Sequence, residues 1–451
     1  MKKNDILTVD IVDNGVNFEG IAKSDGMIIF VPGSITGENI DIRIIKITSS
    51  YAIAKIENIN KKSENRIDET VCPVFKTCGG CEAQHIKYDF QLNIKDRIVT
   101  NTLNRQGVEY NQLNKTIGMG LPYYYRNKVQ YPVRNVNGIN KIGFYSKRTH
   151  NIVENNCCYI QDRVIDMLAK IVFEKLISYG FSGYNEEDFS GDIRHIILKR
   201  GYHTAEIMVV IVVNNKKILT DKRFLKLVDE LDNKHVKGIF LNLNDDNTNE
   251  ILGNETVCIF GEKYITDTIG DYSFYISAKS FFQVNTVQVE MLYNVLKEGL
   301  NLNKDDILFD LYSGVGTIGI FLSANVKKVY GIEIEEEAVE MANKNILKND
   351  IKNCEYIAGG VEDKIEIFKK ENIQPTVIVV DPPRRGLDEK SIQYILDFNP
   401  NKIGYVSCNP ATLARDLKIL SSKYTVTSVT PVDMFPHTVH VECVAVLVSK
   451  V

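Results

Sequence analysis

The chain has 451 residues and a formal net charge of −4; 44% of its residues are hydrophobic and 25% are charged. This balance is typical of folded globular proteins, excludes collagen-like and intrinsically disordered chains, and at this length suits two to four domains. No apolar stretch approaches transmembrane length and the start lacks the apolar region of a signal peptide, so we expect a cytoplasmic protein without a membrane partner.

Residues 1–62 alternate apolar and polar positions over short runs that glycine-containing turns separate. Short strands at this spacing predict a small β-barrel. Its scattered lysines and arginines fit a solvated surface better than a nucleic-acid site. Because the net charge is slightly negative, any nucleic-acid surface has to be a local basic patch.

Three closely spaced cysteines follow, in the pattern Cys72-x5-Cys78-x2-Cys81. Nine cysteines in a chain of this length are not a disulfide scaffold, and their clustering indicates metal ligands beside catalytic or core thiols. With a distant fourth cysteine the trio suits an iron–sulfur cluster, whereas zinc sites usually show paired ligands. Spacing alone leaves a cluster, zinc and no metal open. A helical pattern then runs from about residue 82 to residue 105.

A long strand-rich region extends to about residue 262, and aromatic and basic residues interleave in several of its segments. Such a pattern can stack bases and bind phosphates. It equally fits strands with one core face and one solvated face, and without other evidence the second interpretation is favoured.

From Asp306 the pattern alternates strand and helix, which predicts a doubly wound, mostly parallel sheet. The glycine loop Asp310-Leu-Tyr-Ser-Gly314-Val-Gly316-Thr-Ile-Gly319 follows the first strand, and Glu333 ends the next. A glycine loop that is followed by an acidic residue about 20 positions later predicts the binding of a nucleoside cofactor, but does not identify the cofactor. The alternative is a tight turn with a purely structural role. The predicted strands cover residues 307–311, 328–334, 355–358, 377–380, 403–406, 425–429 and 439–449.

Two further side chains fall at ends of these strands. Asp381 follows the fourth strand and precedes two rigid prolines, and Cys408 follows the fifth, just before a helix that Asn409 is suited to cap. The positive end of that helix should favour the thiolate of Cys408. On this segment alone a nucleophile and a core cysteine are equally good interpretations. Because ligands bind at the carboxyl ends of parallel strands, the coincidence of these acids with Cys408 favours the nucleophile.

The combined motifs resemble the RNA (uracil-5-)-methyltransferase family over the whole chain. They are the segment Phe282-Gln-Val-Asn285, the glycine loop, the strand ending in Glu333, the segment Asp381-Pro-Pro-Arg, and the segments around Cys408 and from Asp433 to Glu442. The resemblance implies an α/β fold: a class I S-adenosylmethionine-dependent methyltransferase with an N-terminal TRAM domain, an OB-like β-barrel, and a mixed central domain.

The same resemblance implies the site residues. Cys408 matches the nucleophile, which adds to C6 of a flipped-out uracil, and Glu442 matches the base, which removes the C5 proton after methylation. A [4Fe–4S] cluster is implied on Cys72, Cys78, Cys81 and Cys158, with Cys157 as the alternative fourth ligand. Thr317 and Gly360 depart from the asparagines of some members. The implied residues of the cofactor and uracil pocket are Gln283, Tyr312, Glu333 and Asp381.

For the substrate, the TRAM domain together with the cluster favours 23S rRNA over tRNA within the family. An RNA cytosine-5 methyltransferase would carry a second cysteine beside Asp381, and an NAD-dependent dehydrogenase would have no use for Cys408 with Glu442. An RNA-binding or assembly factor with a retired active site is the non-enzyme alternative. The modified uridine and the oligomeric state stay open, with a monomer as the default expectation.

We predict three domains, two of them discontinuous in sequence. Residues 1–62 form the barrel. Residues 63–83 and 118–262 form the central, cluster-bearing and RNA-binding domain. Residues 84–117 and 263–451 form the methyltransferase domain.

Overall fold

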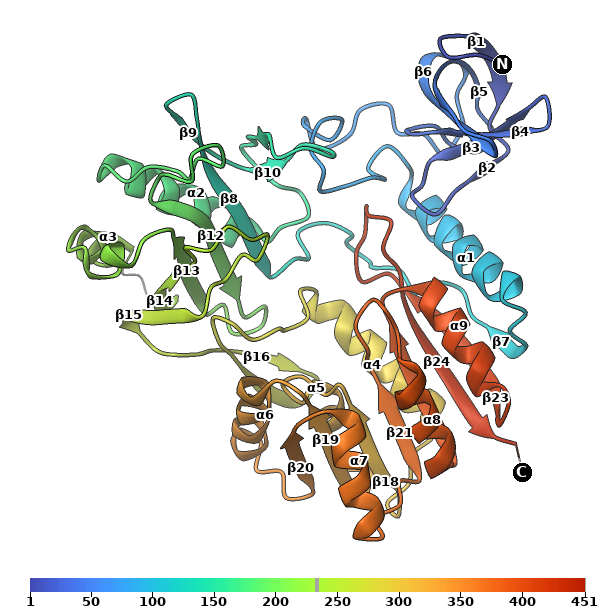
Figure 1. The fold of residues 1–451 in the computed structure, drawn as a ribbon, viewed down its shortest axis with the longest axis vertical. Coiled ribbons are helices and arrows are strands. Elements are labelled where there is room, and N and C mark those ends of the chain that lie inside the picture. The colour runs from blue at the N-terminus through green and yellow to red at the C-terminus, as the bar shows by residue number, and fades with distance from the viewer. Residues whose placement is uncertain (232–234, 451) are drawn as a thin grey trace.

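The computed structural model describes residues 1–231 and 235–450 (Figure 1). Residues 232–234 and 451, which fall within the predicted central and methyltransferase domains, lie outside the described residues. Figure 1 shows three bodies: the N-terminal strands at one corner, a sheet with α2 and α3 on the opposite side, and the C-terminal sheet below.

The N-terminal body is a six-stranded sheet in the order β1-β5-β6-β4-β3-β2. Alternate residues of β5 point inward, and Ile40, Ile42 and Ile44 are fully buried among the core residues. Strands β1 and β3 contact each other although they are not neighbours in the sheet, so the sheet curls into the predicted barrel. The strands are β1 (Ile6–Asp10), β2 (Asp13–Asn14), β3 (Gly20–Ser24), β4 (Met27–Val31), β5 (Asn39–Ile47) and β6 (Tyr51–Lys61).

The central body is a second six-stranded sheet in the order β15-β14-β13-β12-β8-β9. Its strands are β8 (Lys128–Val136), β9 (Ile139–Ile142), β12 (Ile193–Arg200), β13 (Ile207–Val213), β14 (Val236–Leu243) and β15 (Glu255–Gly261). Also here are the strand pair β10 (Phe144–Tyr145) and β11 (Ile152–Val153), the helices α2 (Arg163–Ser178) and α3 (Arg223–Leu231), and the 3-10 turn η1 (Lys216–Thr220).

Strand β13 joins the central body to the C-terminal body. Ile207, Val209 and Ile211 pack with residues of α2 and α3, whereas Met208 and Val210 pack with the strand pair β16 (Ile265–Ile269) and β17 (Tyr272–Ile276) and with α4. Both faces of β13 are therefore covered, which explains why its sequence is an uninterrupted apolar run.

The C-terminal body is an eight-stranded sheet in the order β20-β19-β18-β21-β22-β24-β23-β7. Strands β18 to β22 pair in parallel, and β24 runs antiparallel between β22 and β23. The predicted bounds of β18 and β21 are those observed, whereas the last strand begins at Glu442 and not at residue 439. Its strands are β18 (Ile307–Leu311), β19 (Lys328–Glu333), β20 (Cys354–Ala358), β21 (Val377–Val380), β22 (Lys402–Ser407), β23 (Tyr424–Val432), β24 (Glu442–Ser449) and β7 (Tyr110–Leu113).

Helices cover both faces of this sheet, as a doubly wound fold requires. Leu308 of β18 belongs to the hydrophobic core that contains residues of α4, α5 and α6, and its neighbour Phe309 belongs to the core on the other face, which contains residues of α1, α7, α8 and α9. The bounds are α4 (Thr286–Leu300), α5 (Thr317–Leu322), α6 (Glu336–Lys348), α7 (Val361–Lys370), α8 (Glu389–Phe398) and α9 (Pro410–Leu420), with a 3-10 turn η2 (Ser323–Asn325) after α5.

Helix α1 (Tyr88–Arg105) begins six residues later than the sequence pattern predicts. The amides of Glu82 and Ala83 donate to the carbonyl of His437, and that of Ile86 donates to Ala83, so residues 82–87 follow a different path. Helix α1 packs against α9, and β7 pairs in parallel with β23. Helix α1 and strand β7 thus belong to the edge of the C-terminal sheet. The exact domain boundaries stay a prediction. Within residues 1–231 and 235–450, the structure contains no helix with the length and apolarity needed to cross a membrane.

Candidate active site

Cys408 and Glu442 meet at one edge of the C-terminal sheet. Cys408 directly follows the parallel strand β22, and Glu442 begins β24. Because β24 runs antiparallel to β22, its start lies beside the carboxyl end of β22, and Ser407 is paired with Cys443 in the register. The structure therefore brings together the two residues that the sequence predicted to be the nucleophile and the base.

The same edge carries the point at which the strand order reverses, between β18 and β21. Asp310 lies in β18 and Asp381 follows β21 directly. In open parallel sheets, ligands bind in the crevice at this reversal. Asp310 is fully buried and Asp381 is half-buried.

Cys408 precedes α9, as predicted. Asn409 caps the helix by accepting a hydrogen bond from the amide of Ala411 at 3.0 Å, and Pro410 occupies the first turn. However, the expectation that the helix would favour the thiolate is wrong for this structure: burial and the nearby Glu442 and Asp381 carboxylates raise the pKa of Cys408 to about 11. Arg384 acts in the opposite direction, yet burial and two negative charges outweigh it.

The carboxyl groups at this edge also hold protons more tightly than usual. Burial, followed by the charge of Asp381, raises the pKa of Glu442 to about 8, and Arg384 partly opposes the change. Burial raises the pKa of Asp381 to about 7. Such values allow each carboxyl group to exchange a proton near neutral pH, which a general base requires. Sequence reasoning did not single out Arg384, although its place in the Asp381-Pro-Pro-Arg segment was visible.

The glycine loop divides into a structural part and an open part. A side chain on Gly316 would collide with the ring of Tyr356, and one on Gly319 with the Tyr356 hydroxyl, which donates to the Gly316 carbonyl at 3.1 Å. Gly314 has a φ of +54° and faces open space. The tight-turn interpretation therefore accounts for two glycines, and Gly314 is the one that faces a possible ligand. Nothing in the sequence pointed to Tyr356.

Carboxylates fix both ends of this loop. Asp310 accepts a hydrogen bond from the amide of Gly319, and Glu333 accepts one from the amide of Gly314, each at 2.9 Å. The other carboxylate oxygen of Asp310 is buried without a partner, and burial raises the pKa of this group to about 7. Thr317, one of the two departures from the family, exchanges a hydrogen bond with Tyr293 at 2.8 Å.

The remaining predicted pocket residues lie on segments that lead into the same region. Tyr312 follows β18 with a φ of +63°, and its hydroxyl is 2.9 Å from that of Ser391. Gln283 lies just before α4, and its carbonyl accepts a hydrogen bond from the Asn127 side chain at 3.0 Å. The side chain of Gln283 is half-buried. Their roles toward a ligand stay a prediction.

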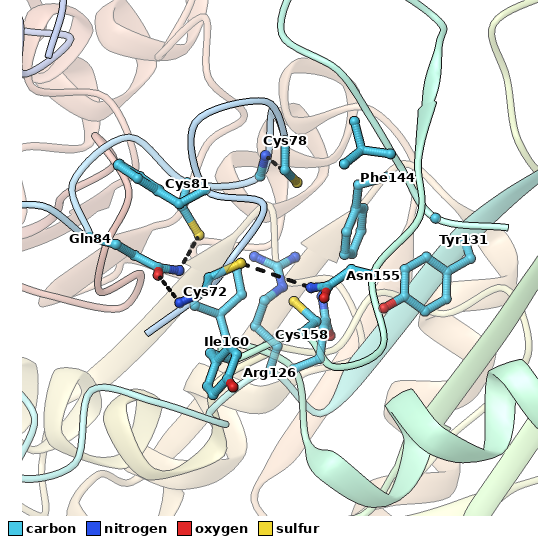
Figure 2. A pocket seen from close by; sticks show the side chains of 16 residues that line it. Cys72, Cys78, Cys81, Gln84, Arg126, Tyr131, Phe144, Asn155, Cys158 and Ile160 are labelled. Atoms are coloured by element: carbon cyan, nitrogen blue, oxygen red, sulfur yellow. Dashed lines mark hydrogen bonds between the residues drawn. The ribbon is translucent and has the colours of Figure 1, made fainter. Parts of the chain in front are cut away.

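The four predicted cluster ligands line one cavity of about 180 Å³ (Figure 2). Cys72, Cys78 and Cys81 come from the segment before α1, and Cys158 comes from the segment before α2. Cys157 is not among the residues that line the cavity. In the part of the chain that the structure describes, no group of three or more His, Cys, Asp or Glu side chains is arranged to hold a metal ion. The cluster therefore stays a prediction.

Nitrogen donors point at three of these sulfur atoms, as the dashed lines in Figure 2 show. The Gln84 side chain donates to Cys81 at 3.4 Å, the amide of Gly80 donates to Cys78 at 3.4 Å, and the Asn155 side chain approaches Cys72 at 3.9 Å. Burial raises the pKa of all three thiols, and the donors from Gly80 and Gln84 act in the opposite direction on Cys78 and Cys81.

Comparisons with known proteins cover the whole chain. Residues 207–451 match the family model described as tRNA (Uracil-5-)-methyltransferase, and residues 2–56 match the TRAM domain. The chain is 43% identical to an uncharacterised RNA methyltransferase of Clostridium acetobutylicum, over 100% of this chain and 98% of the relative. It is 41% identical to an uncharacterised RNA methyltransferase of Oceanobacillus iheyensis, over 100% and 98%.

Among solved structures, the chain is similar to the tRNA (uracil-54, C5)-methyltransferase of Pyrococcus abyssi in complex with S-adenosyl-L-homocysteine. The TM-score is 0.77 at 25% identity, and the match covers 98% of this chain and 100% of that one. The fold class predicted from the sequence is therefore confirmed, including the N-terminal domain.

Proposed function

The chain belongs to the RNA (uracil-5-)-methyltransferase family, and we propose that it transfers a methyl group from S-adenosylmethionine to C5 of a flipped-out uridine in 23S rRNA. The observation that carries the proposal is the pairing of β22 with β24, which sets Cys408 beside Glu442 at the sheet's ligand-binding edge. A thiol next to a carboxyl group whose pKa is about 8 suits covalent catalysis followed by proton removal.

The residues of the glycine loop fit the cofactor. The buried Asp310 oxygen without a partner, the open space at Gly314 and the carboxylate of Glu333 supply polar groups on one side of the crevice. Each oxygen of Glu333 keeps acceptor capacity for a ribose hydroxyl. When bound, S-adenosylmethionine would supply the methyl group to be transferred.

In the mechanism, Cys408 adds as a thiolate to C6 of the uracil, which makes C5 nucleophilic. After C5 has gained the methyl group, Glu442 takes the C5 proton, the C6–S bond breaks and its electrons return to the sulfur of Cys408. The raised pKa of Glu442 makes it an effective proton acceptor near neutral pH. Arg384 reduces the cost of the thiolate by its positive charge. A stacked base has to be flipped out to reach this edge.

We also propose that Cys72, Cys78, Cys81 and Cys158 hold a [4Fe–4S] cluster with a structural role. The four thiols line one cavity, and N–H donors point at the sulfur atoms of three of them, Cys72, Cys78 and Cys81, which fits thiolate ligands. A bound cluster would tie the segment before α1 to the segment before α2. Loss of bound iron in Cys158→Ala, with retention in Cys157→Ala, would support this assignment; the reverse pattern would make Cys157 the ligand.

A tRNA substrate is the second candidate, because the similarity to the Pyrococcus abyssi tRNA enzyme extends over 98% of this chain. The match therefore includes the barrel, and the barrel alone does not favour rRNA.

The test is methyl transfer from labelled S-adenosylmethionine to unmodified 23S rRNA and to tRNA, by protein purified without oxygen. Mass spectrometry would identify the methylated nucleoside. Cys408→Ala should abolish 5-methyluridine formation, and Cys258→Ala, a half-buried thiol outside the site, should not. Label in tRNA alone would contradict the rRNA assignment, and label in neither RNA would favour a retired active site.

A further inference from the structure

The segment that leads into Glu442 has no regular secondary structure of its own. Residues 433–441, here called the Glu442 loop, lie between β23 and β24. They are nevertheless mostly buried, and residues more than 300 positions earlier in the sequence hold them. The loop that ends at Glu442 is thus held by contacts that another part of the chain supplies.

The first contact is a fully buried ion pair at the start of the loop. Lys95 of α1 and Asp433 each have a side-chain exposure of 0%, and Nζ lies 2.6 Å from Oδ1. The Lys95 ammonium also donates to the carbonyl of Phe435 at 3.3 Å, and the Tyr88 hydroxyl donates to the second Asp433 oxygen at 2.9 Å. Both ends of the charge pair are therefore fixed in direction as well as in distance.

The second contact surrounds His437, in the middle of the loop. The Gln91 side chain lies 3.1 Å from Nδ1 of His437 and accepts a hydrogen bond from the His437 amide at 3.1 Å. The amides of Glu82 and Ala83 donate to the His437 carbonyl, each at 3.0 Å. His437 has a φ of +66°, which is unfavourable for a residue with a side chain. The surrounding contacts hold this residue in a conformation that the loop alone would not favour.

A buried ion pair is a weak source of stability, because desolvation of both charges offsets most of their attraction. What a hydrogen-bonded pair provides better than an apolar contact is a defined geometry. Here that geometry is imposed on the loop that ends at the proposed base.

We propose that Lys95 and Asp433 form a positioning pair, which aims Glu442 at the C5 proton of the methylated adduct; this inference rests on the proposed function. The pair touches neither substrate nor cofactor in the proposed mechanism. Its effect is specific to one step. Formation of the Cys408–C6 bond uses the thiol, whereas release needs Glu442 to accept the C5 proton as the C6–S bond breaks.

The experiment follows both steps in single turnover with the full-length enzyme, using the 23S rRNA or tRNA transcript that the wild-type enzyme methylates. Denaturing gels measure the protein–RNA adduct, and mass spectrometry measures released 5-methyluridine. The variant Lys95→Gln/Asp433→Asn removes both charges and keeps polar groups of similar size. Gln91→Met perturbs the contact at His437 while the ion pair stays intact, in case the double variant does not fold. Arg66→Gln/Glu38→Gln is the control, because Glu38 is also fully buried in an ion pair but lies directly before β5 of the barrel.

We expect the double variant and Gln91→Met to form adduct at the wild-type rate and to release product on the order of 10- to 100-fold more slowly, since a small misplacement of a reacting group costs up to this much. The barrel control should leave both steps unchanged. Thermal melting of each variant would verify its fold. Unchanged release, or equal slowing of formation and release in folded protein, would overturn the inference.

Glu442→Gln separates the inference from its premise. If Glu442→Gln accumulates adduct and the positioning variants do not, only the positioning pair is wrong. If Glu442→Gln releases product freely, the base assignment fails, and the inference fails with it.

Discussion

Two buried regions of this molecule treat carboxyl groups in opposite ways. At the active-site edge, within the described residues, Glu442 and Asp381 have no ion-pair or hydrogen-bond partner, and burial raises both pKa values toward neutrality. At the base of the Glu442 loop, Asp433 is fully buried, is paired with Lys95 and accepts a hydrogen bond from Tyr88. Unpaired carboxyl groups exchange protons, whereas the paired one fixes a conformation. The fold thus separates the groups that carry out proton transfer from the groups that hold them in place.

The largest effect should come from removing the proton acceptor. In Glu442→Gln we expect release of methylated product to fall by roughly 10²- to 10⁴-fold, because the general base is lost. The protein–RNA adduct should accumulate on denaturing gels. Glu340→Gln, an exposed carboxylate on α6, is the control and should behave as wild type. If Glu442→Gln releases methylated product at the wild-type rate, Glu442 is not the base that accepts the C5 proton.

The next effect concerns the paired region. Lys95→Met alone leaves Asp433 buried without its cation, so we expect the free energy of unfolding to fall by about 3–5 kcal/mol. The double variant Lys95→Gln/Asp433→Asn should lose much less, because it leaves no unpaired charge. Urea unfolding of the two variants measures the difference. Equal losses of unfolding free energy in the single and the double variant would show that the unpaired Asp433 charge is not the source of the destabilisation.

The pH dependence of stability tests the unpaired region directly. The pKa of Glu442 is raised from its ordinary 4.5 to about 8, so between these values the folded state holds a proton that the unfolded state has lost. Stability should therefore fall as pH rises from about 5 to about 8, and level off above that. Over this window Glu442→Gln should gain roughly 2–5 kcal/mol relative to wild type, measured by urea unfolding at several pH values. Parallel curves for the two proteins would contradict the raised pKa.

The smallest effect should come from removing an uncharged hydrogen bond at the same edge of the sheet. Tyr356→Phe removes the hydroxyl that donates to the Gly316 carbonyl but keeps the ring against the glycine loop. We expect a loss of about 1 kcal/mol in the free energy of unfolding. Product formation should be close to wild type. A loss as large as that of Lys95→Met would show that the loop depends on this bond as strongly as the Glu442 loop depends on its ion pair.

The sequence predicted those features that neighbouring residues determine. The strand at residues 307–311 and the helix after Asn409 appear as expected, because an apolar run and a cap with proline are local signals. The meeting of Cys408 with Asp381 also followed from local patterns, since parallel strands end at one edge. The roles of these residues stay proposals.

Features that depend on distant residues were not visible. The pKa of Cys408 rises because the thiol is buried and because Glu442, 34 positions on, lies beside it, whereas the sequence showed only the adjacent helix. The start of α1 was misplaced because the amides of Glu82 and Ala83 bond to the Glu442 loop and that of Lys87 bonds to the carbonyl of Asn65. The residues next to Lys95 in the sequence predict only a helix. They give no sign that Lys95 pairs with Asp433, 338 positions away.

That separation has a consequence for the synthesis of the chain. The ribosome makes Lys95 long before Asp433, and β7 long before its neighbour β23. Until Asp433 and β23 have left the ribosome, α1 has neither the counter-charge nor the sheet edge that allow it to be buried. We expect α1 to stay exposed in the nascent polypeptide until β23 and the Glu442 loop have been synthesised.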